Sequence, residues 1–125
     1  YHVRIGFEFS LMKAESFIPP HNDVENKLIS LMIYFPSQDM KPNNNFGTNF
    51  YKPKNDVLEN IWRGDMMNND ESNNFFKKNS IFHHSQFTKN KLVGFLKSNN
   101  SWHDVSHLDK KEVSRRSLNI NLYKF

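Results

Sequence analysis

Two segments, one near each end of the chain, alternate apolar and polar residues with a period of two. In residues 2–9, Val, Ile and two Phe occupy every second position. Residues 115–125 alternate in the same way, with Leu and Ile on one face and Arg, Ser and Asn on the other. Successive side chains of an extended strand point to opposite faces, whereas a helix repeats every 3.6 residues. The alternation therefore predicts two half-buried β-strands.

Three more segments are typical of strands. Residues 27–35 are apolar on both faces, which predicts a central strand between two layers. Residues 47–53 end at a Pro and suit an edge strand or a strand terminus, and residues 90–97 run into the turn-forming Ser-Asn-Asn-Ser. Residues 54–89 are polar and irregular, and their one plausible short helix is 56–64. We expect an all-β sandwich or barrel with few or short helices.

Composition limits the class of protein. The chain has 125 residues, 37% of them hydrophobic, which suits a single packed domain spanning 1–125. The absence of Cys excludes disulfides and thiolate metal sites and fits a cytoplasmic protein. No apolar stretch reaches the length of a membrane span, and no leader peptide is visible.

The net charge of +4 leaves nucleic acid open as a partner. Residues 41–54 interleave basic and aromatic side chains, as surfaces that bind single strands do. An ordinary strand with a solvated face has the same mixture, and Lys and Arg are otherwise scattered among Asp and Glu. The charge pattern does not favour nucleic-acid binding.

The polar face of the last predicted strand has two interpretations. It carries Arg115, Ser117 and Asn119 opposite a fully apolar face. Antiparallel sheets commonly keep one face in solvent, and the strand alone favours this interpretation. The other interpretation is a polar cavity between two sheets, where Arg115 would bind a carboxylate through two parallel hydrogen bonds.

A candidate metal site begins directly after a Pro pair. His21 and Asp23 are two positions apart, which puts them on the same side of an extended strand, although they also suit a solvated turn. His103 follows a later predicted strand and turn. Two imidazoles and one carboxylate form the facial triad that holds non-haem Fe(II). His83 and His84 are adjacent on a strand and cannot both reach one ion, and His107 lies in an apparent loop, so all three are expected at the surface.

These motifs occur in one order along the chain: H-x-D at His21 and Asp23, LISLMIYF at 28–35, GTNFY at 47–51, NKLVGFLKSNNSWHDV at 90–105, and R-x-S at Arg115 and Ser117. In this order and spacing the chain resembles the iron- and 2-oxoglutarate-dependent dioxygenase superfamily, and within it the prolyl-hydroxylase-like branch. The resemblance extends from about residue 3 to the end and is loosest over 54–89. It implies a double-stranded β-helix, the cupin-like jelly roll, with a metal between two sheets.

The resemblance also implies roles for individual residues. His21, Asp23 and His103 would bind Fe(II), and Arg115 would pair with the distal carboxylate of 2-oxoglutarate. Arg116 is a rival for that role, but strand alternation places it on the apolar face. The further candidates for the co-substrate pocket are Ser117, Tyr34 and Asn119. For Tyr34 a core aromatic whose hydroxyl is bonded elsewhere is an equal alternative.

The implied reaction is hydroxylation of an unactivated C–H by O₂, with decarboxylation of 2-oxoglutarate to succinate. The substrate would be a peptide side chain, prolyl-like, or a small molecule, held by residues 36–46 and 54–89, and the basic balance slightly favours an anionic one. The chain departs from the family in lacking helices before the first strand that brace the sheet. Two alternatives come from other classes: a non-catalytic jelly-roll binding module and a basic nucleic-acid-binding β-domain.

Overall fold

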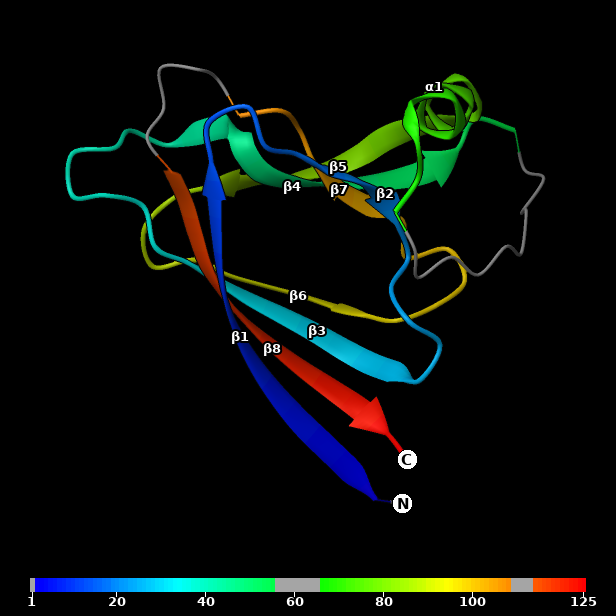
Figure 1. Cartoon of the computed structure of the whole chain (residues 1–125), viewed down its shortest axis with the longest axis horizontal. Coiled ribbons are helices and arrows are strands. Elements are labelled where there is room, and N and C mark those ends of the chain that lie inside the picture. The colour runs from blue at the N-terminus through cyan, green and yellow to red at the C-terminus, as the bar shows by residue number, and fades with distance from the viewer. Residues whose placement is uncertain (1, 56–65, 109–113) are drawn as a thin grey trace.

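The computed structural model describes residues 2–55, 66–108 and 114–125. Within them the chain is β-rich, with two four-stranded antiparallel sheets packed face to face and one helix (Figure 1). The elements in chain order are β1 (Val3–Lys13), β2 (Ile18–His21), β3 (Lys27–Tyr34), β4 (Asn43–Pro53), α1 (Asn69–Lys78), β5 (Asn79–Phe87), β6 (Leu92–Leu96), β7 (His103–Val105) and β8 (Ser114–Lys124).

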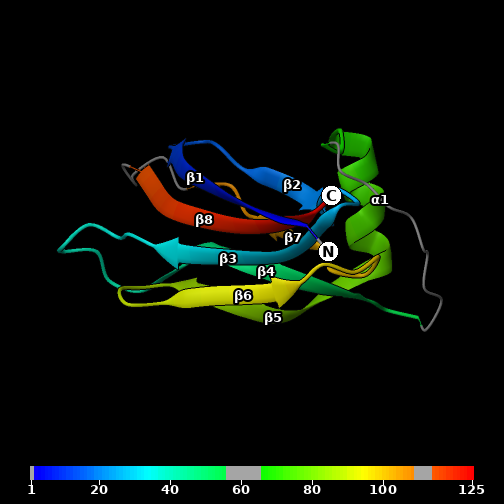
Figure 2. The same cartoon turned by 90° about the horizontal axis from the view of Figure 1, so that it is seen from below.

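The strand order interleaves the two halves of the chain. One sheet has the order β1-β8-β3-β6 and the other β2-β7-β4-β5. Figure 2 shows the four strands of the first sheet side by side in this order. The first and last strands pair along their whole length, from Val3 opposite Lys124 to Lys13 opposite Ser114. The early β2 lies beside the late β7, which brings residues distant in the sequence into one site.

The hydrophobic core lies between the sheets. Phe46 of β4 and Phe87 of β5 are fully buried, and their rings pack 5.9 Å apart. Tyr34 of β3 crosses from the other sheet, with its ring 4.9 Å from that of Phe87. These aromatic contacts hold the two sheets together at the end of the molecule where β3 ends.

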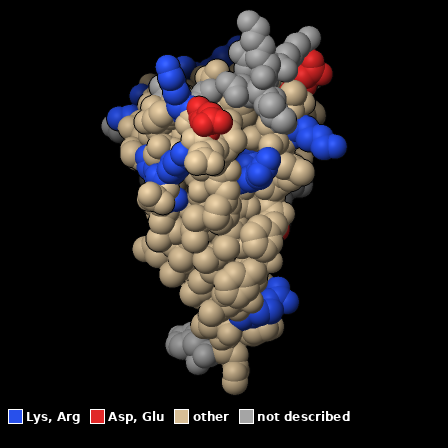
Figure 3. All heavy atoms as spheres, turned by 90° about the vertical axis from the view of Figure 1, so that its left-hand side faces the viewer, with Lys and Arg blue, Asp and Glu red and all other residues tan. Residues whose placement is uncertain are grey.

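The apolar face of the first sheet points away from this core. Phe7 and Phe9 of β1 are 68% and 81% exposed, and they pair with Ile120 and Leu118 of β8. The view in Figure 3 shows a broad uncharged area between the charged upper part and the basic groups near the lower tip. The prediction that β1 is half-buried through its apolar face is wrong, because this face is the exposed one. A period of two defines the two faces of a strand but not which of them turns inward. Within the described residues no second layer covers β3 on this side, contrary to the two-layer prediction.

The two environments of Phe predict very different mutational effects. Phe87→Ala should lower the free energy of unfolding by about 3–5 kcal/mol, because it opens a cavity in the core. Phe9→Ala should change it by less than about 0.5 kcal/mol, because the ring is mostly in solvent. Urea unfolding of both variants measures the difference. Equal losses would contradict the outward orientation of β1.

The region 54–89 is more regular than the sequence predicts. It contains α1, which begins with a capping box: the Asn68 side chain accepts a hydrogen bond from the Glu71 N–H, and the Glu71 carboxylate accepts one from the Asn68 N–H. The strand β5 follows α1 directly, and the sequence pattern does not predict this strand either. The helix predicted at 56–64 lies outside the described residues. Among the described residues, no helix has the length and apolarity needed to cross a membrane.

Of the two alternatives for residues 47–53, the strand terminus is right. Pro53 ends β4, where a residue without an N–H breaks no ladder. However, β4 is an inner strand between β7 and β5, not an edge. This position places β4 directly beside the predicted ligand His103, since β4 pairs with β7 at Phe50 and His103.

Candidate metal centre

The two predicted histidine ligands face each other across neighbouring strands. His21 is the last residue of β2 and His103 the first of β7, and the two residues are direct partners in the antiparallel register. Directly paired side chains point to the same face of a sheet. The imidazole centroids are accordingly 4.2 Å apart.

Asp23 reaches the imidazoles by a turn rather than by strand alternation. β2 ends at His21, and Asp23 has a left-handed backbone with a φ of 67°. Asp tolerates this region better than most residues. The side chain of Asn22 between them is bonded elsewhere, donating to the Asn99 carbonyl at 2.9 Å. The prediction that the two side chains point to one side is therefore right, but the extended geometry behind it is wrong.

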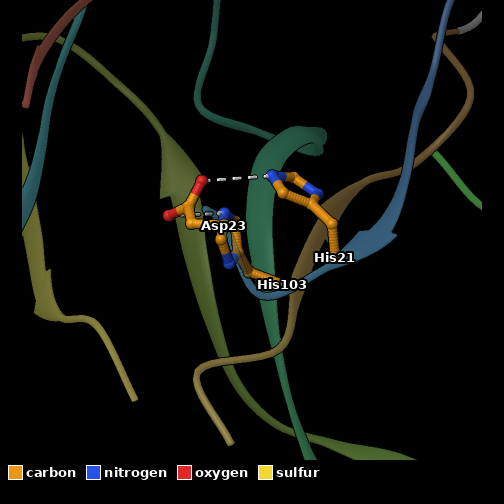
Figure 4. Close-up of side chains that lie close together, drawn as sticks. All are labelled: His21, Asp23 and His103. Carbon is orange, nitrogen blue, oxygen red and sulfur yellow. Dashed lines mark ion pairs between the residues drawn. The ribbon is translucent and has the colours of Figure 1, made fainter. Parts of the chain in front are cut away.

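The three side chains converge on one point (Figure 4). Asp23 Oδ1 is 3.6 Å from His21 Nε2, and Asp23 Oδ2 is 3.9 Å from His103 Nε2. Each residue offers a ligand atom within 4.8 Å of the other two. Two imidazoles and a carboxylate so placed could hold a metal ion.

Backbone carbonyls fix the histidine tautomers. His21 Nδ1 donates to the Pro19 carbonyl at 3.0 Å, and His103 Nδ1 donates to the Ser101 carbonyl at 2.8 Å. A carbonyl oxygen can only accept, so the proton of a neutral ring resides on Nδ1. Each Nε2 then presents its lone pair toward Asp23, which is the state that binds a metal.

The charge state of the cluster suits a cation. Burial lowers the pKa of His103 to about 4, and the neighbouring His21 adds to the effect, so this imidazole is neutral at pH 7. Burial by itself would raise the pKa of Asp23, but attraction to the imidazoles of His103 and His21 in their protonated form and the hydrogen bond and charge of Lys27 outweigh it, so this pKa lies below its ordinary value. The Asp23 carboxylate is therefore ionised at pH 7 beside the neutral imidazole of His103.

The lowered pKa of His103 makes the stability of the metal-free protein depend on pH. Above pH 6.5 the imidazole is neutral in both the folded and the unfolded chain. Between pH 6.5 and about 4 only the unfolded chain takes up the proton, so the free energy of unfolding should fall as the pH is lowered through this window. The loss at pH 5 should be on the order of 2 kcal/mol. Urea unfolding at pH 7 and pH 5 tests this, and a His103→Gln variant with the same pH slope would contradict it.

Two further side chains hold Asp23, and no pattern in the sequence predicts them. Lys27 Nζ donates to Asp23 Oδ1 at 2.8 Å, and Ser30 Oγ donates to Asp23 Oδ2 at 3.1 Å. An extended segment would carry Lys27 far from Asp23. Only the turn closed by the Lys27 N–H and the Val24 carbonyl at 3.1 Å brings the two together.

Arg115 is buried between the sheets, so the polar face of the last strand turns inward at this residue and the solvent interpretation is wrong, while a carboxylate partner for Arg115 stays a prediction. Its side chain is 2% exposed, with Nε donating to the Phe46 carbonyl at 2.7 Å and Nη1 to Ser117 Oγ at 3.2 Å. Nη2 has no hydrogen-bond partner, and no acidic side chain within the described ranges forms an ion pair with Arg115. By contrast Arg116 is exposed, as strand alternation predicts.

The other co-substrate candidates lie in the same interior. Tyr34 is buried, with its ring 5.2 Å from the Arg115 guanidinium, and its hydroxyl is bonded to Thr48 Oγ1 at 2.7 Å. Ser117 is buried and donates to Asn119 Oδ1 at 3.4 Å, while Asn119 is half-buried. Tyr34 is thus a core aromatic whose hydroxyl is bonded elsewhere, and its role in a co-substrate pocket stays a prediction.

A row of polar side chains leads from Arg115 to the metal cluster. The register of β3 and β8 pairs Tyr34 with Ser117, then Met32 with Asn119, then Ser30 with Asn121. Ser30 is the residue that donates to Asp23. The inner face of this sheet therefore connects the buried cation with the His-Asp-His group.

The remaining histidines divide into two kinds. His83 and His107 are exposed, as predicted. His84 is half-buried and hydrogen-bonded to Asn49, so the surface prediction is wrong for it. Asn49 in turn donates to Asp104 at 2.7 Å on the opposite side of β7 from His103.

No family model matches the sequence, and a search of curated proteins finds no significant similarity. The functional assignment therefore depends on the residues themselves.

Proposed function

We propose that the protein is an Fe(II)- and 2-oxoglutarate-dependent dioxygenase of the prolyl-hydroxylase-like branch. It would hydroxylate an unactivated C–H of a peptide side chain or a small molecule. The observation that carries the proposal is the pairing of a His-Asp-His group with a buried Arg115 that lacks an anionic partner. The interleaved order of the two sheets supports a double-stranded β-helix.

The residues present fit both the metal and the co-substrate. His21, Asp23 and His103 supply the two nitrogens and one oxygen that non-haem Fe(II) takes from proteins, leaving other coordination positions open. A buried guanidinium with a free Nη2 is a strong site for a carboxylate, because burial makes an uncompensated charge costly. 2-Oxoglutarate and its product succinate are both dicarboxylates, so each can present a carboxylate to Arg115.

When bound, Fe(II) and 2-oxoglutarate supply the oxidation: O₂ places one oxygen atom in the substrate as hydroxyl and the other in succinate, with release of CO₂. The protein orients the ligands. The Pro19 and Ser101 carbonyls fix the two imidazoles, and Lys27 and Ser30 fix the Asp23 carboxylate.

At the other end of the row, Arg115 orients the co-substrate through its distal carboxylate. The fully buried rings of Phe46 and Phe87 exclude water from this end, which strengthens the ion pair. The intact set of four polar groups argues against a binding module that has lost its chemistry, because such a module has no need of a buried unpaired cation.

Anaerobic titration tests the proposal. The protein with Fe(II) should develop a weak visible charge-transfer band when 2-oxoglutarate is added, and admission of air should then yield succinate. A protein that binds neither Fe(II) nor 2-oxoglutarate would overturn the proposal. Salt-dependent binding of oligonucleotides in place of the band would favour the nucleic-acid alternative.

A further inference from the structure

A cavity of about 240 Å³ opens beside the metal cluster. It is lined by Ile18, His21, Asp23, Val24, Lys27, Met66 and Tyr123. Its ionisable groups at neutral pH belong to the cluster and to Lys27, Tyr123 adds an aromatic ring with a hydroxyl, and the other lining residues are apolar. The volume suits one side chain or a small molecule rather than an extended ligand.

Lys27 is the only cation among the residues that line this cavity. Its side chain is 11% exposed, and Nζ lies 5.9 Å from the centre of the Tyr123 ring while it contacts Asp23. Lys27 is therefore the lining residue that can pair with an anion in the cavity.

The charges at the loaded site do not balance, if the proposed function is right. Asp23 and Lys27 neutralise each other in the metal-free protein. A divalent metal adds two positive charges and Arg115 one, while 2-oxoglutarate adds two negative charges. The loaded site then carries one uncompensated positive charge in a largely buried space, which is costly unless an anion approaches it.

We propose that this cavity is the substrate subsite and that it takes a carboxylate next to an apolar group, with the carboxylate paired to Lys27. The walls from Ile18, Val24 and Met66 contact the apolar part. Lys27 lies beside the metal ligand Asp23, so a carboxylate paired to it holds the adjoining C–H groups near the metal. A small carboxylic acid and the C-terminus of a peptide could each supply a carboxylate next to an apolar group.

The test uses two probes of equal size, N-acetylproline and its uncharged amide. Binding to the full chain is measured anaerobically by calorimetry in the presence of Fe(II) and 2-oxoglutarate. The acid should bind about tenfold more tightly than the amide, the effect of one hydrogen bond to a charged group. Lys27→Met should remove this preference, Lys27→Arg should retain it, and Lys77→Met, an exposed lysine of α1, should leave it unchanged.

The outcomes separate the two proposals. Equal affinities for acid and amide while the charge-transfer band is intact would overturn the substrate inference and leave the dioxygenase proposal standing. Absence of the band would overturn the dioxygenase proposal. A preference for the acid that survives in Lys27→Met would overturn the role of Lys27. Tighter binding of a peptide ending in proline than of N-acetylproline would identify the peptide C-terminus as the source.

Discussion

Replacing His103 by Ala should weaken Fe(II) binding at least about 100-fold, because even groups that only support a metal ligand contribute 10- to 100-fold to metal affinity. His103 is buried, held by Ser101, and directly opposite His21. No other histidine within the described residues joins the group of possible ligands, so nothing replaces the lost nitrogen. Anaerobic titration with Fe(II), followed by the charge-transfer band with 2-oxoglutarate, measures the loss.

His83→Ala is the matched control for this experiment. His83 is exposed on β5 and lies outside the His-Asp-His group, although its ring is 5.9 Å from that of Phe50. This variant should bind Fe(II) like the parent protein. If both variants bound Fe(II) normally, the metal would not be held by His103 and the facial triad would be wrong.

Replacing Arg115 by Met should weaken 2-oxoglutarate binding at least about 30-fold, because losing one partner of a buried charge pair costs about 2–5 kcal/mol. Fe(II) binding should be unchanged, since Arg115 is not part of the His-Asp-His group. The free energy of unfolding should change by less than about 2 kcal/mol. The loss of the bond to the Phe46 carbonyl is offset by removal of a buried charge that has no counterion.

The neighbouring Arg116→Met variant is the control, because Arg116 is exposed on the opposite face of the same strand. It should bind 2-oxoglutarate normally. Calorimetric titration of the Fe(II)-loaded protein compares the two variants. Equal weakening by both would mean that the net charge of the protein, rather than a buried anchor, attracts the co-substrate.

Local patterns in the sequence predicted most of the strands, because period two is a property of the extended backbone itself. They predicted β8 nearly to its ends and β1 except for its last four residues, and strand alternation correctly separated Arg115 from Arg116. They failed at α1, whose start depends on the reciprocal hydrogen bonds of Asn68 and Glu71 in a polar segment. They also failed to orient β1, because both faces of that strand satisfy the same pattern.

The candidate metal site shows a similar division. The types of ligand could be read from the sequence, since the imidazole and carboxylate groups of His21, Asp23 and His103 are the ligands of the facial triad. Their convergence could not. It depends on the pairing of β2 with β7, on the left-handed backbone at Asp23, and on the turn that brings Lys27 to its carboxylate.

The sequence by itself determined that this protein is β-rich and which side chains could bind a cation or an anion, because both follow from local periodicity and side-chain chemistry. Only the tertiary structure decided that the polar face of β8 points inward, so that Arg115 is buried without an anionic partner. Inward and outward are relations between two sheets, set by pairings between residues far apart in the chain. No window of sequence contains both partners.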